Sequence, residues 1–554
     1  MRQSDEQLSF GSDAAKRETA TWSQRLLWND AQWLMPDDAY FNIEVEVPLP
    51  GAVSRRQVLD AMGLLLSRHD TLRTQVYLDD SGELLQDVVK TGSVPVRVER
   101  DEDPDSAAKR ILKEMRTSPF RFPGELPLRI AVLEDGAAPR RLLMVLSHIL
   151  FDRTGVDLLT ADLERLVSNA ELPGPGVQPV SRAVFERSAE GAELSERAVG
   201  LWLETMASAP PSTFDGSLGK PAELRFVRVE MASPAAATAL ELLSSRLNVT
   251  NSTVLLSSVA TVLAAITGRD TILFKLIVGN RFLPGLAELA GITVGNALVA
   301  VKTNGCSLSE IAAVTSRSYL NAQAHAQCDP VRLAEAIRSA DRRRGAVTRF
   351  GTFFNDSRLS RPEAVSEAEP SIEDAEGQKA LTRIRTVAGW QRQNLEFFFE
   401  PYSGADCEVF SVIVDTELVS EEHAHEFLRT LESLLLKQLR SDTGVEAAQL
   451  AADAPAPGPE GRWMRKDGIL VDLRVVEEIV RAVSACPRAF AVCEDGELIA
   501  YIPSPAAGFD PMRLHRSVMA QLARSRRAAA PDRYVQLVSE SGERVVLAAG
   551  SGRD

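Results

Sequence analysis

Helical and extended sequence patterns alternate along this chain, which restricts it to folds that pack helices against sheets. The segment SRRQVLDAMGLLLSR begins with a candidate N-cap, Ser54, and places Val58, Met62, Leu65 and Leu66 on one helical face. The alternation typical of a strand follows in TLRTQVYL. Further along, PAAATALELLSSRLNV and TVLLSSVATVLAAIT predict two helices, and TILFKLIVGN predicts a strand that ends at a Gly-Asn turn. The predicted fold class is therefore mixed, α/β or α+β.

Segments rich in proline and glycine divide the chain. ELPGPGVQPV at residues 171–180 indicates a soft boundary, and ADAPAPGPEG at residues 452–461 indicates a linker between domains. The acidic run RPEAVSEAEPSIEDAEGQ, from Arg361, is typical of an exposed loop. The predicted segments are a flexible N-terminus at 1–18, two large halves at 19–175 and 176–450, a linker at 451–461 and a small C-terminal unit at 462–554.

Composition excludes several classes of partner. A net charge of −15 and a pI near 5.2 argue against nucleic acid, because binding a duplex requires a basic surface. The polar N-terminus lacks a signal-peptide pattern, and the most apolar stretches fall short of the roughly 20 residues that span a bilayer. Five widely spaced cysteines without a CxxC pair fit reduced thiols, so we expect a cytoplasmic protein with no disulfide framework, structural zinc or membrane segment.

One segment combines an apolar strand, a histidine and an amphipathic helix. In RLLMVLSHILFDRTGVDLLTADLERL, His148 is expected at the end of the strand, and Asp152 follows four residues later. A strand end holds a side chain rigidly while the turn exposes it. A neutral imidazole in such a place can take a proton from an amine or hydroxyl nucleophile that attacks a thioester.

The spacing alone leaves two other interpretations open. His148 and Asp152 could be a hydrogen-bonded core histidine and a helix N-cap, or an i, i+4 metal pair on a helix. The other histidines lack a comparable pattern, although His69 in RHDTLRT is expected to join a structural hydrogen-bond network. These remaining histidines are His69, His325, His423, His425 and His515.

Several motifs in order resemble the condensation domains of nonribosomal peptide synthetases, which belong to the superfamily of chloramphenicol acetyltransferase. TWSQRLLW resembles the opening SxAQxRLW motif, RHDTLRT resembles RHExLRT, and SHILFDR aligns with HHxxxDG. FRFPGELPLRIAVLE resembles the segment before the active site, and GLWLETMASAP resembles the helix that contains tryptophan. VGNRFLPGLAELAGITVGNALVAVKT resembles the family's GR segment followed by GxFVNT. The resemblance covers about residues 20–445 and implies two acetyltransferase-like halves that form a V around a tunnel.

The resemblance also implies roles for individual residues. His148 takes the place of the second, catalytic histidine of HHxxxDG, and Asp152 takes that of the structural aspartate, whose arginine partner aligns with Arg281. A buried carboxylate paired with a guanidinium makes physical sense, because the pair offsets the cost of desolvation. The tunnel residues implied are Asn296, Gly291 and Gly155, although Asn296 could also be an ordinary turn asparagine.

Two residues depart from the family pattern. Ser147 stands where the first, chiefly structural histidine is expected, and Arg153 replaces a glycine. Glycine permits positive φ and a close backbone approach, whereas arginine adds bulk and charge. Arg153 could narrow the acceptor side, bind an anionic acceptor or mark a site that has lost its chemistry.

The C-terminal hundred residues predict a helix, a strand, an EDG turn and a second strand. They resemble the small C-terminal subdomain of adenylation domains in degenerate form, because ESGERV places Glu543 where that subdomain carries a lysine. We interpret the unit as a relic that serves as a scaffold or docking surface.

The resemblance predicts a free-standing condensation enzyme. It would transfer an acyl or aminoacyl group from the phosphopantetheine arm of an acyl or peptidyl carrier protein to an amine or hydroxyl, on a small molecule or a second carrier. No cofactor or metal bound to the chain itself is implied. Two alternatives remain: an acyltransferase that uses free acyl-CoA, and a catalytically silent platform that recruits carrier proteins.

Overall fold

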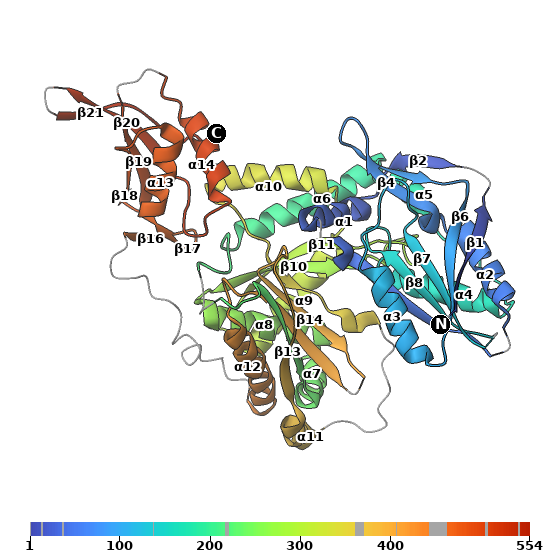
Figure 1. Cartoon of the computed structure of the whole chain (residues 1–554). Helices are drawn as coiled ribbons and strands as arrows, with labels where there is room; N and C mark the ends of the chain where they lie inside the picture. The colour runs from blue at the N-terminus through green and yellow to red at the C-terminus, as the bar shows by residue number, and fades with distance from the viewer. Residues whose placement is uncertain are drawn as a thin grey trace. The chain divides into compact units, whose positions relative to one another are not determined.

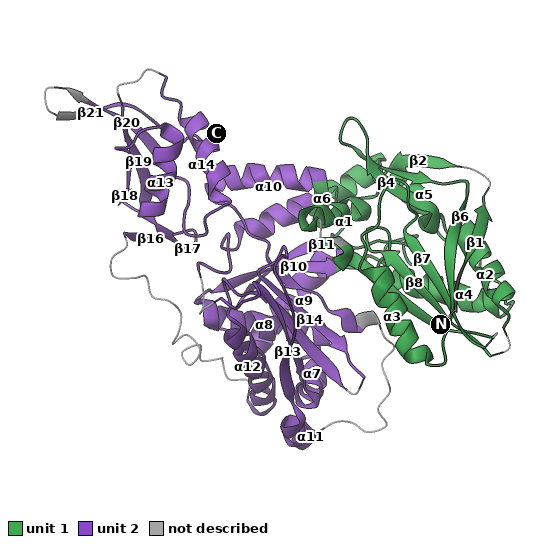
Figure 2. Ribbon diagram, in the orientation of Figure 1, with its two compact units in different colours: residues 1–198, 278–296, 326–330 green, residues 199–277, 297–325, 331–554 purple. Residues whose placement is uncertain are grey.

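The structure is a computed structural model that describes the chain except for residues 1, 13–14, 36–37, 52, 137, 217–220, 361–370, 406, 442–461, 505–507, 541–542 and 554. The chain divides into two compact units (Figure 1; Figure 2). Unit 1 comprises residues 1–198, 278–296 and 326–330; unit 2 comprises residues 199–277, 297–325 and 331–554. The predicted linker at 451–461 and the start of the acidic run lie outside the described residues.

A twisted sheet buried on both faces forms the centre of unit 1. Its described strands run in the order β1 (Arg2–Gly11), β6 (Thr91–Arg100), β7 (Leu128–Asp135), β8 (Ala138–Ser147) and β3 (Asn42–Pro48). Side chains along β8 alternate between two core clusters, with Leu142, Met144 and Leu146 in one and Leu143 and Val145 in the other. Helices α2 (Arg55–Arg68) and α4 (Arg153–Val167) cover the first face, and α3 (Pro104–Arg116) covers the second.

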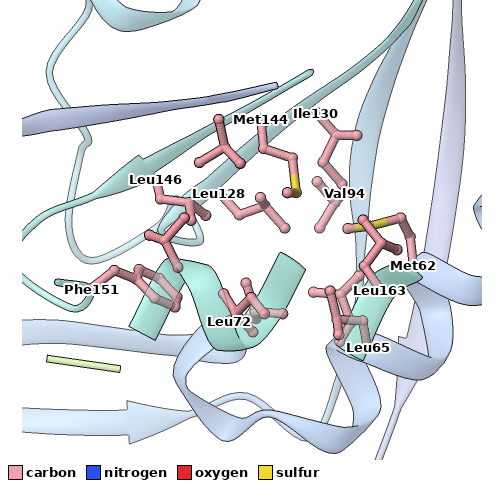
Figure 3. Close-up of a cluster of buried hydrophobic side chains, with 14 of the residues drawn as sticks. Met62, Leu65, Leu72, Val94, Leu128, Ile130, Met144, Leu146, Phe151 and Leu163 are labelled. Atoms are coloured by element: carbon pink, nitrogen blue, oxygen red, sulfur yellow. The ribbon is translucent and has the colours of Figure 1, made fainter. Parts of the chain in front are cut away.

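Helix α2 begins and packs as the sequence predicts. The Ser54 side chain accepts a hydrogen bond from the Gln57 amide, and the Gln57 side chain accepts one from the Ser54 amide, which is a capping box. The predicted apolar face, which includes Met62 and Leu65, is fully buried. Figure 3 shows this face meeting Leu163 of α4 and the sheet residues Val94, Ile130 and Met144.

The N-terminal residues differ from the sequence prediction. Instead of a flexible segment, Arg2–Gly11 forms β1, which pairs antiparallel with β6. Leu8 and Phe10 lie two residues apart and are both buried, so even this polar segment has an apolar face at its end. A second, smaller sheet in the described part of unit 1 joins β2 (Lys16–Thr19), β5 (Leu84–Val88) and β4 (Thr74–Leu78). The remaining helices of this region are α1 (Trp22–Leu34), α5 (Pro179–Glu186) and α6 (Ala189–Ala207), the last of which continues into unit 2.

Unit 2 contains a larger mixed sheet. Its described strands run in the order β11 (Gly295–Lys302), β10 (Thr271–Val278), β12 (Thr352–Phe354), β14 (Phe397–Ser403), β15 (Glu408–Asp415), β9 (Phe226–Ala232) and β13 (Arg383–Trp390). Helices α7 (Pro234–Leu247), α8 (Asn251–Thr267) and α12 (Glu421–Arg440) pack together, and α12 contacts β9 and β15. Further described helices before residue 442 are α9 (Leu308–Ala324), α10 (Pro330–Arg344) and the short α11 (Ile372–Gly377).

The two apolar segments before the β10 strand form helices, as predicted. Every residue of α8 from Ser252 to Ala265 is buried. Within the described residues, no single helix is both long and apolar enough to cross a membrane; α7 and α8 reach that threshold only as a pair, which bends by 107° at its break.

The C-terminal residues form a small α+β arrangement, as the sequence pattern indicates. Strands β16 (Trp463–Lys466) and β17 (Ile469–Asp472) precede α13 (Leu473–Ser484), β18 (Phe490–Glu494), β19 (Glu497–Pro503), α14 (Pro511–Leu522), β20 (Arg533–Glu540) and β21 (Glu543–Gly550). The predicted EDG turn joins β18 to β19, with positive φ at Asp495 and Gly496. Strands β19 and β20 are parallel, and α14 makes the crossover between them.

Adjacent leucines on α2 test how much stability the unit 1 core contributes. Leu65 is fully buried, whereas Leu64 is 59% exposed. Leu65→Ala should lower the free energy of unfolding by about 2–5 kcal/mol, because it removes apolar contacts and leaves a cavity. Leu64→Ala should change it by less than about 0.5 kcal/mol. Urea unfolding followed by circular dichroism measures both, and equal effects would contradict the placement of α2.

Candidate active site

The turn after β8 places His148 where the sequence predicts it. Strand β8 ends at Ser147, and α4 begins at Arg153. The Ser147 carbonyl accepts hydrogen bonds from the Leu150 and Phe151 amides, at 3.0 and 3.1 Å, which closes the turn. Because His148 precedes α4, it cannot form an i, i+4 metal pair with Asp152 on one helix.

The imidazole of His148 is oriented by a backbone group. Its Nδ1 lies 2.5 Å from the Phe151 carbonyl oxygen. A carbonyl can only accept, so Nδ1 carries the proton and the neutral ring leaves Nε2 unprotonated. Among the described residues Nε2 has no hydrogen-bond partner, and the side chain is only partly buried. His148 is therefore held in the tautomer that a general base requires.

Both oxygens of the Asp152 carboxylate accept hydrogen bonds. Its Oδ1 accepts hydrogen bonds from the Gly155 amide, at 2.8 Å, and from Arg281 Nη2. Its Oδ2 accepts one from the Thr293 amide, at 2.8 Å, and lies 3.1 Å from the Thr293 hydroxyl. The residue is 4% exposed. Asp152 is thus both the N-cap of α4 and the buried partner of a guanidinium, so the helix-cap interpretation is also correct.

Arg281 holds the loop between β10 and β11. Beyond the ion pair, its guanidinium donates to three backbone carbonyls: Leu286 at 3.0 Å, Leu289 at 2.6 Å and Gly291 at 2.7 Å. Near the start of the loop, Asn280 has a left-handed φ of 56°. One arginine therefore fixes the curvature of the loop and its attachment to the start of α4.

Gly155 and Gly291 allow two backbone segments to come into contact beside the Asp152–Arg281 ion pair. A Cβ on Gly155 would lie 2.6 Å from the Gly291 carbonyl oxygen, and a Cβ on Gly291 would lie 2.9 Å from Thr71 Oγ1. The Ile292 amide also donates to the Leu150 carbonyl, at 2.8 Å. Gly155 and Gly291 are required by this close approach of two segments, which is a role distinct from the tunnel wall implied by the resemblance.

The other predicted residues take varied places. Ser147 is buried at the end of β8 and acts in the turn through its backbone. Arg153 is the first residue of α4; its side chain is 70% exposed and pairs with Asp157 at 3.0 Å. Asn296 is half-buried within β11, so the interpretation as a turn asparagine is wrong. His69 joins a structural network as predicted, with Nε2 2.9 Å from Asp162.

Sequence reasoning missed the groups that complete the site. The Phe151 carbonyl has no sequence signature, because any residue supplies the same backbone oxygen. Thr293 lies within the GITVGN segment, but nothing in its spacing from Asp152, 141 residues away, could reveal the contact. The first contact is local to the turn, whereas the second exists only in the folded chain.

The Cys328 thiol, next to Gln327 in the chain, does not suit nucleophile chemistry. Burial raises the pKa of the Cys328 thiol to about 12, so this sulfur stays protonated at neutral pH. Among the described residues, no three His, Cys, Asp or Glu side chains lie close enough to hold a metal ion.

A buried carboxylate lies at the end of α5. Glu186 accepts hydrogen bonds from Arg182 Nε, at 2.8 Å, and from the Trp22 amide, at 2.7 Å. Burial raises its pKa, the charge and hydrogen bond of Arg182 and the Trp22 amide lower it, and the charge of Asp329 adds a small increase. The net result is a pKa of about 7. Glu186 therefore titrates near neutral pH inside the protein.

Solved structures show which fold this is. Similar structures include the condensation domain that mediates chain release from the enacyloxin polyketide synthase, with a TM-score of 0.60 and 16% identity over 80% of this chain and 84% of that one. The SgcC5 protein of Streptomyces globisporus gives a TM-score of 0.58 and 15% identity over 77% of this chain and 100% of that one. The mixed α/β fold predicted from the sequence is thus the fold of condensation domains, which confirms the predicted class.

The family follows from the sequence comparison. The condensation domain model matches residues 18–372, and the chain belongs to the condensation-domain family, whose chemistry is acyl transfer. Phosphinothricin tripeptide synthetase PhsC of Streptomyces viridochromogenes is 27% identical over 335 residues, 58% of this chain and 31% of that protein. Surfactin synthase subunit 1 of Bacillus subtilis is 26% identical over 259 residues, 46% of this chain and 7% of that one. The matched part spans less than a third of either relative.

The contact between Gly155 and Gly291 can be tested with a matched glycine. Gly155→Ala forces a methyl group against a backbone oxygen and should lower stability by about 1–3 kcal/mol or more. A Cβ on Gly200, within α6, would meet no atom within 4 Å, so Gly200→Ala should raise stability by about 0.5–1 kcal/mol. Denaturant titration of both variants checks the difference; a neutral Gly155→Ala would contradict the close approach.

The buried Glu186 predicts a dependence of stability on pH. In the unfolded chain a glutamate ionises near pH ~4.3, whereas in the folded protein Glu186 keeps its proton up to its pKa of about 7. Between these values the folded state binds more protons, so this group's contribution to stability falls as pH rises. The glutamine in Glu186→Gln does not titrate, so the variant should lack this fall in the free energy of unfolding. Between about pH 5 and 8, the wild type should lose on the order of 2–4 kcal/mol relative to the variant. Thermal unfolding of both proteins at the two pH values measures it, and a gap in Tm that stays constant would refute the shift.

Proposed function

We propose that this chain transfers an acyl or aminoacyl group from the phosphopantetheine thioester of a carrier protein to an amine or hydroxyl, with His148 as general base. The observation that carries the proposal is the hydrogen bond from His148 Nδ1 to the Phe151 carbonyl, which leaves Nε2 free to accept a proton. Membership of the condensation family supports the same chemistry.

The proposed reaction uses the imidazole twice. Nε2 accepts the proton of the nucleophile as its nitrogen or oxygen attacks the thioester carbonyl. The tetrahedral intermediate then expels the phosphopantetheine sulfur, which takes the proton back from the imidazolium. A carbon–sulfur bond is exchanged for an amide or ester bond, and a free thiol is released.

The remaining predicted residues would act by position. Asp152 and Arg281 would hold the turn and the loop, with Gly155 and Gly291 allowing their backbones to meet. Asn296, half-buried in β11, would contact substrate. Ser147 and Arg153 need not abolish activity, because the first acts through its backbone and the second points to solvent.

The C-terminal residues support a secondary proposal. Their helix and strand order fits a degenerate adenylation-type subdomain, and Glu543 stands where that subdomain has a lysine. We assign it a scaffold or docking role rather than ATP chemistry.

Acyl transfer can be tested with carrier proteins supplied as separate polypeptides. Intact-protein mass spectrometry follows the loss of acyl groups from loaded carrier across a panel of amine and alcohol acceptors. His148→Ala should reduce transfer by about 10²–10⁴-fold, because it removes the base. His325→Ala, a histidine of α9's C-cap, is the matched control and should stay near wild type.

Each alternative has its own outcome in this assay. Turnover with acyl-CoA but not with carrier protein would favour a CoA-dependent acyltransferase. Carrier-protein binding without turnover by the wild type would favour a recruitment platform. Equal activity of the wild type and His148→Ala would overturn the assigned base.

A further inference from the structure

A buried glutamine lies behind the loop that grips Asp152. Gln327 is 3% exposed. Its Oε1 accepts a hydrogen bond from Arg182 Nη2, at 2.9 Å, and its Nε2 donates one to the Thr293 carbonyl, at 3.0 Å. Arginine can only donate and a carbonyl can only accept, so the orientation of the amide is fixed by its neighbours.

Thr293 connects this glutamine to the catalytic turn. The Thr293 amide donates to Asp152 Oδ2, at 2.8 Å, while its carbonyl accepts from Gln327. Asn280 Nδ2 also donates to that carbonyl, at 2.9 Å, so both acceptor positions of the oxygen are occupied. Thr293 alone thus links Gln327 to the Asp152 carboxylate that caps α4.

The far end of the connection is anchored in α5. Arg182 is 8% exposed and pairs with Glu186 one helical turn away. Glu186 is in turn fixed by the Trp22 amide, and the Arg182 guanidinium lies over the Phe185 ring at 4.8 Å. A buried contact between a carboxyl group and a guanidinium rarely adds stability over apolar packing. The hydrogen bond from Arg182 to Gln327 is consistent with a positioning role instead.

Backbone packing holds Gln327 in place. A Cβ on Gly295 would overlap the Ala326 carbonyl oxygen, so the segment at 326–330 presses directly on the start of β11. Only glycine allows this approach, and it brings Gln327 within reach of Thr293.

We propose that Gln327, held by Arg182 and Glu186, is a positioning residue that sets the orientation of His148 through Thr293 and Asp152. The Asp152 cap determines where α4 begins, and therefore where the Phe151 carbonyl meets His148 Nδ1. The effect of Gln327 on turnover rests on the proposed acyl transfer, but the effect of Gln327 on the orientation of the His148 imidazole does not. Asn280 shares the Thr293 carbonyl, so losing Gln327 should loosen the turn rather than collapse it.

The test compares two buried glutamines in the full chain. Gln327→Met removes both hydrogen bonds while keeping an unbranched side chain of similar length. Gln86→Met is the matched control, because Gln86 is also buried in unit 1 but has other partners. It donates to the Thr19 carbonyl, at 2.9 Å, and more weakly to the Pro179 carbonyl, at 3.5 Å, and it accepts from Gln24, at 3.4 Å. Nitrogen-15 NMR of labelled histidine reports the tautomer of His148, whose signals are assigned by their loss in His148→Ala.

The expected result is a shift of His148 toward the Nε2-protonated tautomer in Gln327→Met alone. With carrier-bound acyl donor, kcat should fall about 10- to 100-fold while KM changes less than about twofold, because orientation rather than binding is lost. An unchanged tautomer in Gln327→Met, or equal shifts in both variants, would overturn the positioning role. A tautomer shift without turnover by the wild type would retain the positioning role and overturn the proposed function instead.

Discussion

The Asp152 carboxylate joins two segments of unit 1 that lie more than a hundred residues apart in the chain. One oxygen binds the start of α4 and the Arg281 guanidinium; the other binds the Thr293 amide. Each of these donors would cost free energy if left buried without an acceptor, so removing the carboxylate would strand several groups at once. The turn that carries His148 is fixed because this charge is fully satisfied.

The site depends on backbone more than on side-chain identity. The Phe151 carbonyl orients the imidazole, the Ser147 carbonyl closes the turn, and three loop carbonyls receive Arg281. At the two departures from the family pattern, Ser147 contributes through its backbone and the Arg153 side chain pairs with Asp157. Arg153 occupies the first turn of a helix, where the backbone needs no glycine, and its charge is satisfied by Asp157.

Local sequence patterns predicted those features that local physics determines. The N-cap at Ser54, the buried face of α2 and the strand end at His148 follow from periodicity and capping chemistry. The pairing of Asp152 with Arg281 came from the family resemblance, since 129 residues separate them. The strand β1 was hidden because only Leu8 and Phe10 mark its apolar face. Gln327, Arg182 and Thr293 could not be predicted, because their contacts exist only once three distant segments have packed.

The group that orients His148 is a backbone carbonyl and not a side chain. A general base needs an accurate orientation but no particular partner side chain, so a backbone carbonyl serves as well as a carboxylate. The Phe151 carbonyl can only accept a hydrogen bond, so it orients the ring by fixing the proton on Nδ1. Nε2 is then left with a free lone pair, which suits removal of a proton from an attacking amine and its return to a departing thiolate. Accuracy must come from the frame that fixes the carbonyl, which here is the Asp152 cap and the residues that hold it.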